Sequence, residues 1–169
     1  MFWPILGFIG SVVAGIIVAL IYQHKQKEKI TNYLINILTK KGYKVSVSKT
    51  KQHDYIIESD KKLYLVKLIM ANNRNEIVMA NAQRWYLNAM RDSTKASKNI
   101  RIVSEIVPLV TYDVTSNKEL VKVFLIYPGA GKIVKYVNES EIIFVTPKIN
   151  CWNYKVINYG DIEEHFDEL

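Results

Sequence analysis

The sequence predicts an α/β fold, a mixed sheet flanked by helices, that follows one N-terminal transmembrane helix. Two observations lead to this prediction. Helix-type and strand-type patterns of apolar residues succeed one another along most of the chain, which is typical of mixed α/β domains. The first 23 of the 169 residues contain no Asp, Glu, Lys or Arg. We therefore divide the chain into an anchor, residues 1–23, and one soluble α/β domain, residues 24–169.

The anchor prediction rests on the length and composition of the first segment. Residues Phe2 to Tyr22 are almost entirely apolar, and about 20 such residues cross the hydrocarbon core of a bilayer as a helix. Trp3 and Tyr22 stand near the two ends, where aromatic side chains favour the interface. A cleavable signal peptide would begin with positive charge and end in small residues. Neither feature is present, so we expect an anchor that stays on the chain.

The residues that flank the apolar run predict its orientation. Lys25, Lys27 and Lys29 follow it directly, and positively charged flanks favour the cytoplasmic side. The prediction is a single-pass protein of the cell membrane, with its N-terminus outside and its C-terminal domain in the cytoplasm. Small residues four apart often form packing faces between membrane helices, and we expect self-association through three of them: Gly7, Ser11 and Gly15.

The first half of the remaining chain reads as one helix and three strands. Apolar residues at helical spacing predict an amphipathic helix over 24–41, which Gly42 ends. Alternating apolar residues predict strands over 43–48 and 55–58. The nearly continuous apolar run 63–70 predicts a central strand.

The second half is predicted to contain another helix and further strands. Apolar residues roughly on one face predict a helix over 78–91. Residues 120–127 form a strong strand pattern that ends at Pro128. We expect two more strands, over 133–137 and 141–145, and an acidic terminal helix over 161–169 with Asp161 as its cap.

Composition points to an anionic partner. The chain carries 23 Lys and Arg against 16 Asp and Glu, a net charge of +7. Such a balance favours nucleic acid or anionic lipid, although abundant solvated lysines are an equal alternative. The single cysteine, Cys151, excludes an intramolecular disulfide.

One pair of residues suggests chemistry. Asp54 opens the second predicted strand, and Lys67 interrupts an otherwise apolar face of the third. Metal-dependent nucleases hold a divalent cation with carboxylates from neighbouring strands, and a lysine lies near the reacting phosphate.

From these residues the chain resembles the PD-(D/E)XK, or restriction-endonuclease-like, superfamily over roughly residues 25–127. The resemblance is mainly one of element order: a helix, a strand with Asp54, a strand with Lys67, then a helix. It implies that Asp54 is a metal ligand and Lys67 the catalytic lysine. It also implies that Glu28 is the acid of the first helix, and that Gln83 and Tyr86 are the polar pair of the following helix.

The sequence departs from that family at Leu65. The family has Glu, Asp or Gln two residues before the lysine, and an apolar side chain there removes a ligand unless Glu58 or Glu76 replaces it. We therefore expect a non-catalytic binding or scaffold module without a cofactor. The alternative is an active metal-dependent nuclease that uses Mg²⁺ or Mn²⁺.

Overall fold

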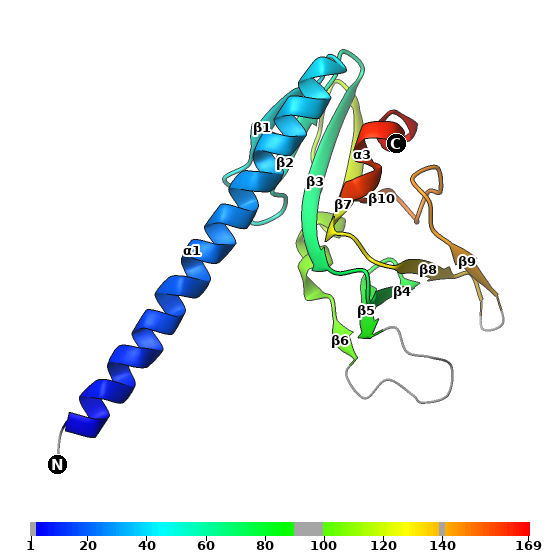
Figure 1. Cartoon of the computed structure of the whole chain (residues 1–169). Coiled ribbons are helices and arrows are strands. Elements are labelled where there is room, and N and C mark those ends of the chain that lie inside the picture. Colours follow the sequence, from blue (N-terminus) through cyan, green and yellow to red (C-terminus); the bar gives the residue numbers. More distant parts are fainter. Residues whose placement is uncertain (1–2, 90–99, 139–140) are drawn as a thin grey trace. The chain divides into compact units, whose positions relative to one another are not determined.

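A computed structural model gives the fold and describes residues 3–89, 100–138 and 141–169. The chain divides into two compact units, Met1–Lys41 and Gly42–Leu169. The first unit is a helix, and the second contains the ten strands of the described residues (Figure 1). The fold is therefore mixed α/β, as predicted in its broad class, but it has two sheets where we expected one.

The first unit consists of α1, which runs without interruption from Trp3 to Lys40. The amphipathic helix predicted over 24–41 is its C-terminal part. Lys40 lies in the last turn, where a cation interacts favourably with the helix dipole. Gly42 follows with a φ of 86°, a left-handed conformation that glycine adopts without steric cost. The predicted helix end is therefore confirmed.

The predicted transmembrane anchor over residues 1–23 is contradicted. In the part of the chain that the structure describes, no helix is long and apolar enough to cross a membrane. The predicted membrane localisation and single-pass topology are corrected together with the anchor.

The proposed packing face of small residues lies mostly outside the described side chains. Gly7 and Ser11 precede Val13, so their surroundings are not part of the description. A Cβ built at Gly15 would meet no atom within 4 Å.

The second unit begins with a five-stranded sheet, sheet A, in the order β1–β2–β3–β7–β10. Neighbouring strands β1, β2 and β3 are antiparallel, whereas β3, β7 and β10 are parallel to one another. Both faces of β7 are buried at Val123, Phe124 and Leu125, as expected for a central strand. The strands of sheet A are β1 Lys44–Val47, β2 Tyr55–Glu58, β3 Lys62–Ala71, β7 Glu119–Pro128 and β10 Tyr154–Asn158.

The other sheet, sheet B, has the order β6–β5–β4–β8–β9. Its central strands β4 and β8 are parallel, and the remaining pairs are antiparallel. The strands of sheet B are β4 Asn75–Asn81, β5 Arg84–Ala89, β6 Arg101–Ile102, β8 Lys132–Tyr136 and β9 Ile142–Phe144. Between β6 and β7 lie two short helical segments, η1 Ser104–Ile106 and α2 Val107–Val110.

One hydrophobic core joins the two sheets. Phe124 from sheet A and Trp85 from sheet B are fully buried, with ring centroids 4.8 Å apart. Tyr154 lies 5.0 Å from Phe124, and its hydroxyl accepts a hydrogen bond from Trp85 Nε1 at 3.1 Å. The Tyr154 hydroxyl in turn donates to the carbonyl of Ala82 at 3.0 Å. The polar atoms that this aromatic cluster buries are therefore paired.

The predicted helix over 78–91 is wrong, because residues 78–89 belong to β4, a turn and β5. Val78, Trp85 and Tyr86 have helical spacing, but Trp85 points into the core while Tyr86 alternates away from it. Asn81 turns the chain, since its side-chain oxygen accepts a hydrogen bond from the Gln83 amide at 2.9 Å. Asn favours such turns because it can hydrogen-bond the backbone two residues on.

The C-terminal residues hold two further differences. We did not predict β10, although it adds a parallel strand beside β7. The terminal helix is present only as short turns, η2 Tyr159–Asp161, α3 Ile162–His165 and η3 Phe166–Glu168. Asp161 occupies the N-cap position of α3 but makes no side-chain capping hydrogen bond, so its predicted capping role is wrong.

Candidate functional site

The predicted pair of Asp54 and Lys67 does come together in sheet A, where β2 begins beside β3. The main chain of Asp54 extends the hydrogen-bond ladder of β2 by one residue on both sides. Its amide donates to the carbonyl of Val66 in β3 at 2.8 Å, and its carbonyl accepts from the amide of Ser48 after β1 at 2.9 Å. Asp54 therefore holds three neighbouring segments of backbone in register.

The side chain of Asp54 also links β2 to β3. Its Oδ2 accepts a hydrogen bond from the amide of Leu68 in β3 at 3.0 Å. The same oxygen lies 3.4 Å from Lys67 Nζ. These side chains are only 20% and 14% exposed, so the ion pair is largely shielded from water. A shielded ion pair needs further hydrogen bonds to offset desolvation, and the Leu68 amide supplies one.

Lys67 has a second partner that gives it a structural task. Its Nζ donates to the carbonyl oxygen of Lys51 at 2.9 Å. Lys51 belongs to the segment between β1 and β2, residues 48–53, which we call the basic loop. The ammonium of Lys67 therefore links β3 to the basic loop and does not project freely into a cleft. This contact also explains why a lysine interrupts the apolar face of β3.

The basic loop is organised by its own hydroxyl groups. Ser48 Oγ accepts a hydrogen bond from the Thr50 amide at 3.1 Å and lies 3.1 Å from Thr50 Oγ1. Thr50 Oγ1 is in turn 3.4 Å from His53 Nδ1. These contacts, with the Lys67 contact to Lys51, fix the loop at several points. They leave the side chains of Lys49 and Lys51 exposed.

His53 is the buried titratable residue of the site. It is 3% exposed, and its ring lies 5.7 Å from that of Tyr112. Among the described residues, its Nε2 has no hydrogen-bond partner. Burial lowers the pKa of His53 from 6.5, the nearby Asp54 carboxylate opposes this change, and the Lys67 ammonium adds to it. The neutral ring is therefore the form that suits this environment.

Neither acid that could replace the missing ligand at Leu65 joins Asp54. Leu65 itself is buried in the core between the sheets. Glu58 lies at the far end of β2 and pairs with Lys118 at 2.8 Å, a hydrogen bond that lowers the pKa of Glu58. Glu76 belongs to sheet B, where it pairs with Lys132 at 2.9 Å. Across the described parts of the chain, no group of three or more His, Cys, Asp or Glu is placed to hold a metal ion.

The remaining residues implied by the resemblance lie in different elements. Glu28 is in α1, which forms the other unit of the chain. Gln83 is in the turn between β4 and β5, and Tyr86 is in β5 of sheet B. No helix carries Gln83 and Tyr86, so the element order expected from the resemblance is kept through β3 and differs after it.

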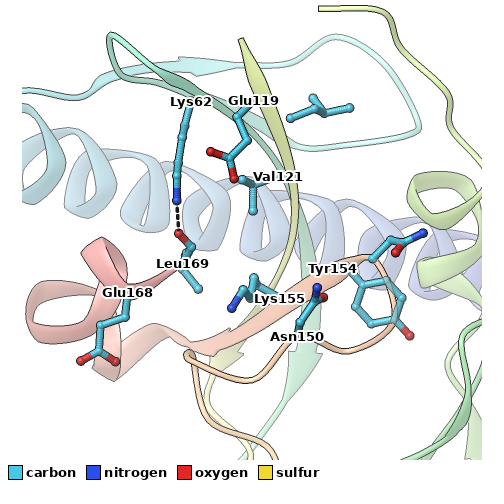
Figure 2. Close-up of a pocket in the computed structure, with 10 residues that line it drawn as sticks. Lys62, Glu119, Val121, Asn150, Tyr154, Lys155, Glu168 and Leu169 are labelled. Carbon is cyan, nitrogen blue, oxygen red and sulfur yellow. Dashed lines mark hydrogen bonds between the residues drawn. The ribbon is translucent and has the colours of Figure 1, made fainter.

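Apart from the Asp54–Lys67 pair, a hollow of about 540 Å³ lies at the amino ends of the parallel strands β3, β7 and β10. Figure 2 shows Lys62 pointing across it to the main-chain oxygen of Leu169, which accepts its hydrogen bond at 2.7 Å. Lys155, on the other side, donates to the carbonyl of Lys148 at 2.7 Å. Ligands of open α/β sheets usually bind at the carboxyl ends of the strands. Both lysines at this hollow bind main-chain oxygens of the chain itself, so we assign these contacts a structural role.

No family model, curated protein or solved structure matches this chain. The site must therefore be interpreted from its own geometry. That geometry is a fixed basic loop with two exposed lysines, Lys49 and Lys51, supported by a shielded Asp54–Lys67 pair. It can present positive charge to an anion from a defined backbone.

Sequence reasoning found the pair but missed the loop and His53. The signal for the loop was present, because Ser48, Thr50 and His53 are polar residues spaced closely between two strands. The burial of His53 could not be predicted from its neighbours in the sequence, since the ring that it faces, Tyr112, is distant in the sequence.

We expect Asp54→Ala to destabilise the protein by about 1–3 kcal/mol, because it removes the acceptor of the Leu68 amide and the carboxylate that balances the charge of Lys67. Asp54→Asn keeps a side-chain oxygen that can accept from the amide and should cost less. Urea unfolding of the full chain measures both. Equal stability of Asp54→Ala and the unchanged protein would contradict the structural role of this carboxylate.

We also expect His53 to make stability depend on pH. Its pKa in the fold is below the ordinary 6.5, so the unfolded chain takes up the proton more readily. The contribution is complete above 6.5 and is lost as the pH falls below that value, with a slope of at most about 1.4 kcal/mol per pH unit. Urea unfolding between about pH 7.5 and 5.5 covers this range.

The variant His53→Gln should reduce that acid-induced loss. His24→Gln, a change of the same kind at an exposed position of α1, should leave it unchanged. An identical pH dependence in the two variants would show that His53 does not titrate differently in the folded protein.

Proposed function

We propose that the unit Gly42–Leu169 is a non-catalytic module that binds nucleic acid through the basic loop, residues 48–53. The observation that carries the proposal is the pair of exposed lysines, Lys49 and Lys51, on a loop held by hydrogen bonds at Ser48, Thr50 and Lys51. Lysine side chains contact the phosphate backbone and supply most of the affinity in sequence-independent binding.

The electrostatics of the loop support an anionic ligand. The loop contains no acidic residue, and no described carboxylate forms an ion pair with Lys49 or Lys51. Asp54 is directed instead at Lys67 and the Leu68 amide, so its charge is already balanced. The net charge of +7 adds a longer-range attraction that raises the rate of encounter.

The hydrogen bonds of the basic loop order its backbone before a ligand binds. A loop that is already ordered loses less conformational entropy on binding than a mobile one. The Lys67 contact holds the carbonyl of Lys51, and the hydroxyls of Ser48 and Thr50 hold the first turn. Both lysine side chains therefore start from a fixed stretch of backbone.

Catalysis is not part of the proposal, because Asp54 and Lys67, which the resemblance would make catalytic, already make structural contacts. Lys67 Nζ contacts Asp54 and the Lys51 carbonyl, and Asp54 Oδ2 accepts from the Leu68 amide. Leu65 offers no carboxylate. A single carboxylate already engaged by an ammonium is a poor ligand for a divalent ion, which nucleases hold with several oxygens.

Anionic lipid headgroups present the same phosphate chemistry as nucleic acid. We favour nucleic acid because the resemblance in element order through β3 is to a superfamily that acts on it. Vesicles therefore serve as the comparison ligand in the binding experiment.

Replacing both loop lysines, Lys49→Gln with Lys51→Gln, is expected to weaken binding to single- and double-stranded DNA and RNA. The slope of log affinity against log salt should fall by about 1.4–1.8, since two phosphate contacts are lost. Fluorescence anisotropy of labelled oligonucleotides over a range of low salt concentrations measures both quantities.

The matched control, Lys61→Gln with Arg74→Gln, removes two other exposed cations. Its net charge therefore equals that of the variant with both loop lysines replaced. Its salt slope should change less than that of the loop variant. Equal effects of the two double variants would show that net charge, and not the loop, drives binding. Binding to vesicles of phosphatidylserine but to no nucleic acid would contradict the choice of ligand.

We further expect no cleavage of DNA or RNA by the full chain in the presence of Mg²⁺ or Mn²⁺. Electrophoresis of several labelled substrates provides the measurement. Cleavage that disappears in both Asp54→Ala and Lys67→Ala would overturn the non-catalytic proposal in favour of a nuclease. Cleavage that both variants retain would indicate a contaminating enzyme.

A further inference from the structure

An aromatic side chain lies beside the basic loop. The ring of Tyr112 is 5.7 Å from that of His53, centroid to centroid, and the two ring planes are inclined by 37°. His53 is the last residue of the loop and follows Lys51 by two positions, and two residues of extended chain span at most about 7 Å. Tyr112 is therefore close to the loop lysines in space, although it is distant from them in the sequence.

The ring of Tyr112 is supported on one side and reaches solvent on the other. His53, which it faces, is 3% exposed, whereas Tyr112 itself is partly exposed. Tyr112 also packs against the core that the two sheets share. Its contacts with His53 and with the core hold the ring from beneath, so the exposed part of the ring is the part that faces away from His53.

The main chain next to Tyr112 is fixed by hydrogen bonds. Thr111 donates to the carbonyl of Val107 twice, from its amide at 3.0 Å and from its hydroxyl at 2.8 Å. Lys122 Nζ, in β7, donates to the carbonyl of Val110 at 3.0 Å. The aromatic ring therefore projects from an ordered stretch of backbone and loses little conformational freedom when a ligand binds.

The charges near Tyr112 favour two different kinds of contact. The exposed ammonium groups of Lys49 and Lys51 attract phosphate. Asp113, directly after Tyr112, is exposed and acidic, so it disfavours a phosphate beside the ring. An uncharged base meets no such repulsion. The arrangement therefore suits a ligand that offers phosphates to the basic loop and the free face of a base to Tyr112.

We propose that the ligand of this site is single-stranded nucleic acid, with its phosphates at Lys49 and Lys51 and a base stacked on Tyr112. Proteins that bind single strands combine positive charge along the backbone with aromatic side chains on which bases stack. In a duplex each base is paired and stacked between its neighbours, and exposing it has a cost that a single strand does not incur. The inference rests on the proposed function and narrows its ligand to single strands of DNA or RNA.

Fluorescence anisotropy of the full chain tests the choice of strand. The probes are labelled oligothymidylate and oligouridylate of about 12 nucleotides, since one such site covers roughly 4–16. A DNA duplex of the same length is the comparison, and at least one of the two single strands should bind about tenfold more tightly than it does. Equal affinity for single strands and duplex would overturn the inference and leave the proposed function in place. Absence of binding to all three probes would overturn the proposed function, and the inference with it.

Substitution of Tyr112 tests the stacking contact. Tyr112→Leu should weaken binding to the single strand by about tenfold, because leucine fills apolar space but offers no ring. The slope of log affinity against log salt should stay unchanged, since no phosphate contact is lost. Tyr112→Phe keeps the ring and should bind as the unchanged protein does. Tyr136→Leu removes an exposed tyrosine of sheet B and should have no effect. Equal affinities of Tyr112→Leu and Tyr136→Leu would overturn the inference.

Photochemical cross-linking needs no substitution, so it decides the matter even if circular dichroism shows that Tyr112→Leu is unfolded. Under ultraviolet light an iodinated uracil in the single strand loses iodide and bonds to an aromatic ring stacked on it, which loses a proton. Trypsin cleaves after Arg101 and Lys118, and residues 102–118 contain Tyr112 as their one aromatic residue. Mass spectrometry should find the nucleotide on this peptide. A nucleotide found only on other peptides would overturn the inference.

Discussion

The Asp54 carboxylate is the constraint on which the basic loop and the neighbouring part of β3 depend. It stands where β2 begins, and its Oδ2 accepts the hydrogen bond of the Leu68 amide in β3. An amide in a sheet needs an acceptor, and leaving it unpaired costs more than an average hydrogen bond contributes. The carboxylate therefore acts as a substitute for strand backbone. Its negative charge then requires a cation, and Lys67 on the same strand supplies it.

The ion pair transmits this constraint to the loop. Lys67 Nζ has one contact to Asp54 and another to the carbonyl of Lys51, so the position of the loop backbone depends on the carboxylate. The main chain of Lys51 is thus held by the partly shielded ammonium of Lys67, and no acid is needed that would neutralise the exposed ammonium of Lys51. An arrangement of this kind keeps the loop positive while the charges beneath it are balanced. The same contacts are the reason that we propose a positioning role for Asp54 and Lys67.

Sheet A shows how much of the fold and site could be predicted from the sequence. The alternation and length of 55–58, 63–70 and 120–127 were sufficient to place β2, β3 and β7. Two strands joined by a short turn also bring Asp54 beside Lys67, because the two residues are close in sequence. Side chains alternate between the two faces of each strand, so the sequence also indicates which residues share a face. Local patterns therefore predicted the pair that proved to be in contact.

Sheet B could not be predicted, because its central pairing joins segments that are far apart. The parallel contact between β4 and β8 links Val78 to Val134, and no local pattern encodes it. Without that partner, the spacing of Val78, Trp85 and Tyr86 fitted a helix equally well. The prediction for the N-terminal segment was wrong for another reason. Its composition predicted a membrane span, whereas the described part of α1 is not long and apolar enough to form one.

The two sheets of the second unit share one buried core, and the basic loop is attached to it. Trp85 of sheet B, with Phe124 and Tyr154 of sheet A, forms one buried aromatic cluster, so the sheets share a core and belong to one compact unit. Tyr112 packs against this core, and its ring lies 5.7 Å from that of His53 in the basic loop. The basic loop is therefore tied to the shared core of the two sheets through His53, and to β3 through the Lys67 contact with the carbonyl of Lys51.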